Sequence, residues 1–208
     1  MSITIIIIVI TVLISILAFS NSELFYKMDF NPYLAEKNKE WHRFISHALL
    51  HADWVHLLFN MLVLYFFGDT TQRHFESYIG AKGAFYFLLL YLGGVVFAVL
   101  PTFKKNKENP NYHSVGASGA VSAVLFSSVL FSPARELCLY GIDFLCFPGI
   151  IWAVIYLVYS YQKSKKSTDH INHDAHFWGA MFGVAFTLIA VPQSLSIFFD
   201  QILRLLPF

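Results

Sequence analysis

The amino-acid sequence predicts an all-α, polytopic membrane protein that forms one domain over residues 1–208. Hydrophobic residues make up 57% of the chain and charged residues only 13%, against about 45–50% and about 25% in ordinary soluble domains. The low charge content is the sharper signal, because a soluble surface needs charged side chains. Twenty-two Phe and eleven Tyr are typical of lipid-facing surfaces and of the aromatic belts at membrane interfaces.

Six apolar segments predict six membrane-crossing helices, because lipid offers the backbone no hydrogen-bond partners outside its own helix. We expect the spans at about residues 3–19, 54–70, 83–101, 115–132, 142–161 and 175–191. A long polar and aromatic loop, residues 20–53, separates the first two spans, and a short interfacial or cytoplasmic tail, residues 193–208, follows the last. A signal peptide is the alternative for the first segment, but that segment lacks a basic start and a small-x-small cleavage site.

The later spans end where proline or lysine residues appear. Pro101 and the Lys-rich run 104–110 follow the third span, Pro133 the fourth, three lysines the fifth and Pro192 the sixth. The net charge of +1 gives no case for a nucleic-acid partner. The two cysteines, Cys138 and Cys146, are expected to be apolar bystanders that form neither a disulfide framework nor a metal cluster.

The alternation of the spans predicts where their polar residues meet. Consecutive spans run in opposite directions, so the second, fourth and sixth begin on the same side of the membrane. Polar residues lie near the starts of these three spans: His56 and Asn60, Ser118, and His176. Intramembrane polar residues are costly and typically functional. We therefore expect these four side chains to lie at one depth and to form one site.

The residue types at this depth suit nucleophilic catalysis. A serine hydroxyl becomes a nucleophile when a base takes its proton, and histidine is the usual base, which indicates a Ser118–His176 pair. Unpaired backbone N–H groups at the start of the fourth helix are suited to a developing oxyanion. His56 and Asn60, one helical turn apart, can supply further donors.

Glycines on the sixth span favour close approach of the two helices. Gly179 and Gly183 lie three and seven residues after His176, on the same helical face. In lipid, small residues let helices pack closely. The sixth span is therefore expected to close on the small face of the fourth span, which is formed by Ser118, Ser122 and Ala123.

Around these residues the sequence resembles the rhomboid family of intramembrane serine proteases. Residues 116–120, GASGA, are similar to the family's GxSG nucleophile motif. Residues 175–183, AHFWGAMFG, match AHxxGxxxG, and residues 56–60, HLLFN, match HxxxN. The three motifs fall at the same ends of alternate spans, in the family's order.

The resemblance implies a six-transmembrane-helix, rhomboid-like bundle that works without a metal or cofactor. It implies a Ser118–His176 dyad with no acidic third member, and an oxyanion hole formed by the Ser118 backbone amide, His56 and Asn60. The substrates would be single-span membrane proteins in the lipid bilayer, cut in or near the transmembrane segment beside a small residue. Helix packing around the dyad would use the small residues Gly116, Gly119, Gly179 and Gly183.

The chain departs from the family pattern at several positions. Ser122 occupies the place, four residues after the nucleophile, where the family often has an aromatic residue stacked on the histidine. What holds the His176 ring is therefore open. Gln72 stands where a glutamate is common, and the loop-one Trp-Arg pair has one residue inserted, giving Trp41-His42-Arg43.

Two arguments disagree about the orientation in the membrane. The family resemblance implies an active site toward the extracytoplasmic side of the cell (inner) membrane, with the N-terminus inside. Ten of the fourteen Lys and Arg residues follow the first, third and fifth spans, and the positive-inside rule would place those loops in the cytoplasm. We favour the family orientation, because the charge rule weakens for long loops.

Two other functions remain open from the sequence. A metal-dependent membrane hydrolase is suggested by His47 and His51 at helical ligand spacing and by a second group before the last span, comprising His170, His173, Asp174 and His176. Zinc sites need three or four such ligands. A catalytically inactive, rhomboid-like client-binding protein is the other alternative, suggested by the departures at Ser122 and Gln72.

Overall fold

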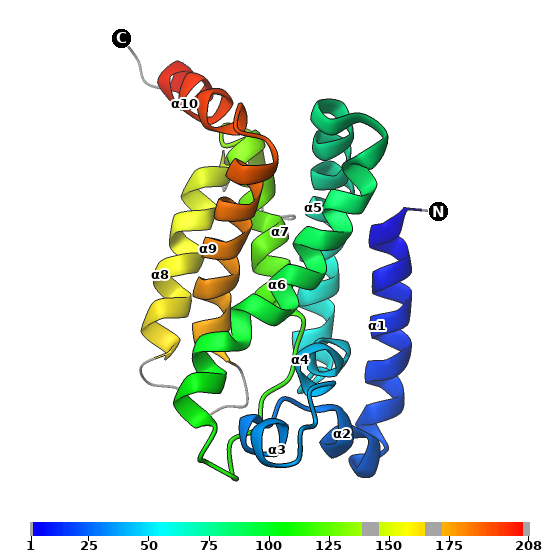
Figure 1. Ribbon diagram of the computed structural model, residues 1–208. Coiled ribbons are helices and arrows are strands. Elements are labelled where there is room, and N and C mark those ends of the chain that lie inside the picture. Colours follow the sequence, from blue (N-terminus) through cyan, green and yellow to red (C-terminus); the bar gives the residue numbers. More distant parts are fainter. Residues whose placement is uncertain (1, 139–145, 165–171, 206–208) are drawn as a thin grey trace.

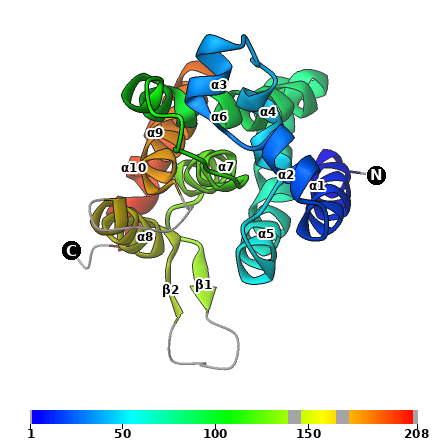
Figure 2. The same ribbon diagram turned by 90° about the horizontal axis from the view of Figure 1, so that it is seen from below.

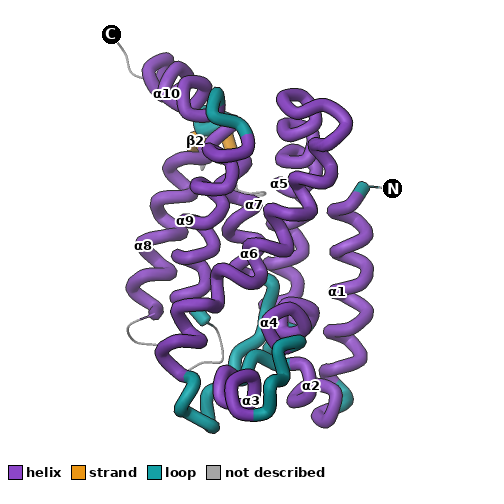
Figure 3. The backbone as a smooth tube through the Cα atoms, in the orientation of Figure 1, coloured by secondary structure: helices purple, strands orange, loops and turns teal. Residues whose placement is uncertain are grey.

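The computed structural model describes residues 2–138, 146–164 and 172–205, and it is a bundle of long helices (Figures 1 and 3). The long helices of the described residues are α1 (Ile3–Phe19), α5 (Trp54–Ile79), α6 (Gly83–Asn106), α7 (Ser118–Phe131), α8 (Gly149–Ser164) and α9 (His173–Ala190). A last helix, α10 (Ser194–Leu205), is bent by 111° from α9. The predicted all-α class is confirmed.

Helix α7 lies at the centre of the bundle when the molecule is viewed from below (Figure 2). Thirteen of its fourteen residues are buried, and several of them are Gly, Ala or Ser. Such side chains let neighbouring backbones approach closely. On the α6 side, a Cβ built on Gly94 would lie only 3.0 Å from the Cα of Ala120. The sequence of α7 therefore suits a helix that is surrounded on all sides.

Residues 20–53 form a folded cap at one end of the bundle, at the bottom of Figure 1. They contain α2 (Ser22–Met28), α3 (Pro32–Lys37), α4 (Arg43–Ser46) and the short 3-10 helix η1 (His47–Leu49). Asn21 and Asn31 start α2 and α3, because each side-chain oxygen accepts a backbone N–H at 3.0 Å.

Buried charges and a backbone pair tie this cap to the segment that leads into α7. Arg43 is 3% exposed and pairs with the fully buried Asp29, whose other carboxylate oxygen bonds to His113. Next to them, Phe30 and Ser114 exchange two backbone hydrogen bonds of 2.9 and 3.1 Å. The approach to Ser118 is thus fixed by the loop between the first two long helices.

The apolar helices differ in length. Among the described residues, the stretch Trp54–Asn106, which comprises α5, one turn of 3-10 helix and α6, is long and apolar enough to cross a membrane. The bent pair α9–α10 would count as a second such stretch. Ile3–Phe19, Ser118–Phe131 and Gly149–Val158 are apolar but shorter. Large apolar side chains are exposed on the outer faces, up to 81% at Ile189 of α9. The count of six membrane spans remains a prediction.

Four helix bounds differ from the expected spans. Helix α6 runs to Asn106 and contains Pro101, which was expected to end the third span. Helix α5 runs to Ile79, well beyond residue 70. Helix α7 begins at Ser118 and not at Val115, because Gly116 adopts φ +123°, a conformation incompatible with a helix. Helix α8 begins at Gly149, because an antiparallel hairpin of β1 (Glu136–Cys138) and β2 (Cys146–Pro148) precedes it. Part of the expected fifth span, residues 142–145, lies outside the described residues.

The expectation for the cysteines was wrong. Cys146 is disulfide-bonded, and the hairpin register places the chain's other cysteine, Cys138, directly opposite it. Directly opposed strand positions have Cβ atoms about 4.5–5.5 Å apart, which is near the reach of a disulfide. The apolar run from residue 142 onward indicates a helix, so neither the hairpin nor the pairing of its cysteines was predicted.

Candidate active site

The four polar residues expected to converge line one cavity. It has a volume of about 220 Å³ and lies among α5, α7, α8 and α9. The polar members of its lining are His56 and Asn60 from α5, Ser118 and Ser122 from α7, Tyr156 from α8 and His176 from α9. The rest of the lining is apolar and comprises Phe59, Val63, Val121 and Leu125. Polar and apolar side chains therefore line the same cavity.

Ser118 is the first residue of α7 and is 9% exposed. Ala117 precedes it and offers no side chain to cap the helix. The first N–H groups of a helix have no partner within the helix, so those of Ser118 and Gly119 are available to an oxygen atom in the cavity. The positive φ of Gly116 creates this sharp start, which explains why a glycine stands there.

His176 lies in the first turn of α9, and an asparagine cap fixes where that turn begins. The Oδ1 of Asn172 accepts the backbone N–H of Ala175 at 3.1 Å. The Nδ2 of Asn172 donates to the buried Thr102 of α6 at 2.9 Å. Sequence reasoning missed both residues, although an Asn before a helix is a recognisable cap. Together they anchor the start of α9 against α6.

Glycines bring α9 against α7 at two levels. A Cβ on Gly179 would overlap the backbone of Gly119, and a Cβ on Gly183 would overlap the backbone of Ala123. A Cβ on Gly119 itself would lie 2.5 Å from the side chain of Ala98 in α6. The three helices therefore meet without intervening side chains, just below Ser118 and His176.

Tyr156 of α8 holds the face of the His176 ring. The two rings are stacked, with centroids 5.6 Å apart and planes 21° from parallel. The Tyr156 hydroxyl lies 2.7 Å from the Oγ of Ser122. The aromatic ring that packs on His176 therefore comes from α8 and not from position 122, where the chain has a serine. The sequence could not single out Tyr156, since the fifth apolar segment contains several aromatic residues.

His56 and Asn60 reach the cavity from the start of α5. The carboxylate of Asp53 caps this helix by accepting the His56 N–H at 2.7 Å. The His56 Nδ1 accepts the Ala52 N–H at 3.4 Å, so the neutral ring carries its proton on Nε2. That atom lies 3.0 Å from where a Cβ on Gly116 would be. The Asn60 Nδ2 donates at 2.8 Å to the carbonyl of His56 in its own helix.

Two further histidines support this end of α5. Ser15 of α1 donates to the Leu49 carbonyl at 2.8 Å, which leaves its Oγ to accept from the Nδ1 of His51 at 3.0 Å. The His51 ring meets the His56 ring edge-on at 5.0 Å. Burial lowers the pKa of His51 to about 3 and the pKa of His47 to about 4. Both rings are neutral and act as packing and hydrogen-bonding groups.

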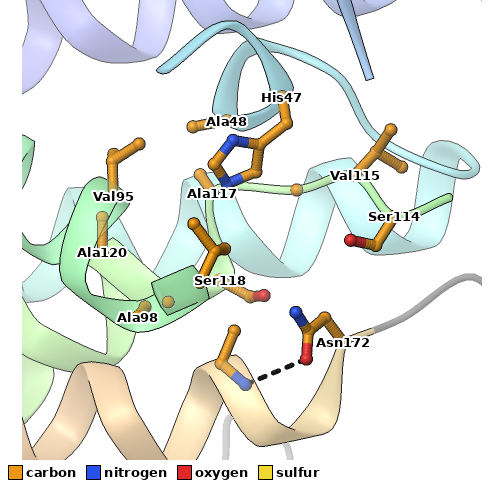
Figure 4. Close-up of a pocket in the computed structure, with 14 residues that line it drawn as sticks. His47, Ala48, Val95, Ala98, Ser114, Val115, Ala117, Ser118, Ala120 and Asn172 are labelled. Carbon is orange, nitrogen blue, oxygen red and sulfur yellow. Dashed lines mark hydrogen bonds between the residues drawn. The ribbon is translucent and has the colours of Figure 1, made fainter. Parts of the chain in front are cut away.

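A second, much smaller pocket lies behind Ser118 (Figure 4). Its volume is about 10 Å³, which is close to the space that one water molecule needs. Ser114, Ser118, Asn172 and His47 bring polar groups to its wall. This pocket thus joins the cap, the start of α7 and the cap of α9.

The histidines do not gather into a metal centre in the described part of the chain. There, no three His, Cys, Asp or Glu side chains are placed to share an ion. Asp174 faces Lys105 at 3.9 Å. His170 and the side chain of His173 lie outside the described part of the chain, and the predicted metal group therefore stays untested at these two residues.

Comparison with known proteins points to one family. The rhomboid domain family matches residues 38–193. YdcA of Bacillus subtilis is 37% identical over 98 residues, which cover 47% of this chain and 44% of YdcA. Rhomboid protease GlpG of Haemophilus influenzae is 32% identical over 103 residues, covering 50% of this chain and 47% of GlpG.

A third relative matches over more of the chain. RHOMBOID-like protein 12, mitochondrial, of Arabidopsis thaliana is 27% identical over 159 residues, covering 69% of this chain and 45% of that protein. The chain spans about half the length of the curated relatives it matches. The family match itself extends from the cap through α9 and includes all three motifs around the cavity. The chain belongs to the rhomboid family.

Proposed function

We propose that this protein is an intramembrane serine protease with Ser118 as nucleophile and His176 as general base. The observation that carries the proposal is the shared cavity, which collects both residues together with His56 and Asn60. Membership of the rhomboid family and the protease name of one relative, GlpG, support it. The same family membership supports a membrane location.

The proposed reaction proceeds by acyl transfer. The Ser118 Oγ loses its proton to His176 and attacks the peptide carbonyl carbon, which gives a tetrahedral intermediate. His176 then protonates the leaving amine, and an ester remains on Ser118. Water enters, His176 takes its proton, and hydrolysis of the ester restores the free hydroxyl. No acidic residue is needed as a third member.

We propose three donors for the oxyanion. The Ser118 backbone N–H is free at the helix start, and the His56 Nε2 carries a proton and faces Gly116. The Asn60 amide can contribute its second N–H, or turn away from the His56 carbonyl that it now contacts. Each such donor is typically worth about 10²–10³ in rate.

The cavity lining also suggests the substrate class. Its apolar members are Phe59 and Val63 from α5 and Val121 and Leu125 from α7. We propose that an extended segment of a single-span membrane protein enters there, with a small residue beside the scissile bond. The site at the first turns of α7 and α9 would allow water to reach it from one side of the bilayer.

We propose the orientation that the family resemblance implied, in a cell membrane with the active site on the extracytoplasmic side. Two observations favour the opposite orientation. Ten of fourteen Lys and Arg residues belong to loops on the Ser118 side, which the positive-inside rule would place in the cytoplasm. The disulfide-bonded Cys146 lies beyond the other end of α7, and disulfides persist in oxidising compartments, so it favours an extracytoplasmic position for that other end. An N-terminal tag that is labelled from outside intact cells would reverse the proposal.

The direct test of activity is cleavage of a single-span substrate by purified protein in lipid vesicles. Wild-type protein should cleave it, and the Ser118→Ala and His176→Ala variants should not. Cleavage that survives in Ser118→Ala would refute the nucleophile. Activity that EDTA removes and zinc restores would favour the metal hydrolase, and an intact fold that binds but never cleaves substrates would favour the inactive client-binding protein.

A further inference from the structure

A chain of hydroxyl groups links α8 to the backbone of the nucleophile. The Oγ of Ser122 donates its only proton to the carbonyl of Ser118 at 2.7 Å. The 2.7 Å contact between Ser122 and Tyr156 must therefore use the tyrosine proton, so the Tyr156 hydroxyl donates to Ser122. The same tyrosine ring stacks on His176. One side chain of α8 thus touches the base and, through Ser122, the residue that carries the nucleophile.

We propose that Tyr156 is a positioning residue that aligns His176 with Ser118, an inference that rests on the proposed function. An imidazole ring rotates readily about its last side-chain bond, and a ring packed parallel to one face restricts that rotation. The hydroxyl bond to Ser122 in turn fixes the tyrosine. The apolar body of this half-buried ring and its polar tip thus act together.

The position of Tyr156 makes the alignment depend on α8. This helix packs inward through Ala153, which is 1% exposed, while Val154, Ile155 and Val158 on its outer face are about half exposed. Tyr156 is a large polar tether between this inner face of α8 and the two helices that carry the proposed dyad. The base is aligned when α8 is seated against α7 and α9. Misplacement of a reacting group by about 1 Å can lower a rate about 10²-fold.

The test measures how fast a fluorophosphonate labels Ser118 in detergent-solubilised protein, alongside kcat and KM for a single-span substrate. Tyr156→Leu removes the stacked ring, and Tyr156→Met is a second variant whose flexible side chain fills the space if the first variant fails to fold. Both should label at least about tenfold more slowly, with the loss falling on kcat more than on KM. Tyr156→Phe keeps the ring and should restore labelling to within about threefold of wild type.

Two further variants test the hydroxyl bond. Ser122→Ala should label no faster than Tyr156→Phe, because it removes the bond to the Ser118 carbonyl as well as the bond to Tyr156. The Ser122→Ala/Tyr156→Phe double variant should be no slower than Ser122→Ala, because the bond between the two hydroxyls can be lost only once. Leu157→Ala is the matched control, since Leu157 packs in the same cluster of α7, α8 and α9 residues. It should leave the labelling rate within about twofold of wild type.

The outcomes separate the two proposals. Wild-type protein that is never labelled at Ser118 would refute the proposed protease and the positioning role together. Wild-type labelling that is unchanged in a folded Tyr156→Leu or Tyr156→Met variant would refute the positioning role alone. Equal losses in Tyr156→Phe and Tyr156→Leu would refute the ring stack, and an equal loss in Leu157→Ala would reduce the effect to general packing of α8.

Discussion

At the scale of single residues, the candidate site combines three kinds of support for its polar groups. Ser118 stands at an uncapped helix start, His176 stands one turn inside a capped one, and Tyr156 packs on the face of the imidazole. The donors on α5 are less prepared, because the Asn60 amide is still bonded within its own helix. Ser118 and His176, the proposed nucleophile and base, are therefore better organised than the proposed oxyanion hole.

Because the Asn60 amide is hydrogen-bonded to the His56 carbonyl of its own helix, we expect only a moderate effect from Asn60→Ala. This change should lower kcat by about 10- to 100-fold, which is less than the loss of a fully committed oxyanion donor, and should leave KM nearly unchanged. Leu62→Ala is a control on the same helix, because Leu62 is 39% exposed and is not among the residues that line the cavity. Steady-state cleavage of a single-span substrate measures both. A kcat for Asn60→Ala equal to that of the control would remove Asn60 from the oxyanion hole.

At the scale of helices, the site depends on the close approach of α7 and α9. Gly119 and Gly179 meet backbone to backbone, and Gly183 repeats the contact one turn further along. The cap of α9 adds a second constraint, because Asn172 bonds both its own helix and Thr102 of α6. Close packing of the two helices thus helps to set the separation of Ser118 and His176.

Gly179→Leu should force α9 away from α7. An added side chain has no room beside the Gly119 carbonyl, and overpacking typically costs about 1–3 kcal/mol. We expect a lower melting temperature in detergent and loss of cleavage even in the folded fraction. Ile189→Ala, at an 81% exposed position of the same helix, should change neither. Normal activity in Gly179→Leu would mean that the helices can separate without disturbing the dyad.

At the scale of the whole molecule, the sequence predicted the convergence of the site better than its surroundings. His56, Asn60, Ser118 and His176 could be placed together because connectivity alone puts their helices in register. Tyr156 could not be found, because hydrophobic patterns do not say which faces of neighbouring helices touch. The hairpin before α8 was missed for a related reason, since a short apolar strand and the start of an apolar helix look alike in sequence.

The folded cap predicts how stability depends on pH. Burial lowers the pKa of His47 from 6.5 to about 4, so between these values the unfolded chain binds a proton that the folded protein excludes. The contribution of His47 is full above about pH 6.5 and falls as the pH drops toward 4. At pH 5 the loss should be about 2 kcal/mol, from 1.36 kcal/mol per pH unit.

Thermal unfolding in detergent between pH 7.5 and 5 checks this prediction. Wild-type protein should lose stability steadily below about pH 6.5. His47→Asn should show a shallower decline, and comparing the two slopes cancels the contributions of other groups, including His51. Parallel slopes for the two proteins would show that His47 is not buried as a neutral ring.

The proposed protease depends on activation of Ser118 by His176, which the rate of covalent labelling of Ser118 reports. Purified wild-type protein treated with a fluorophosphonate should carry the label on Ser118, as mapped by mass spectrometry, and Ser118→Ala should carry none. The His176→Ala variant should label at least about 10³-fold more slowly, with its fold intact. Labelling of His176→Ala at the wild-type rate, or a label on another residue, would contradict the account.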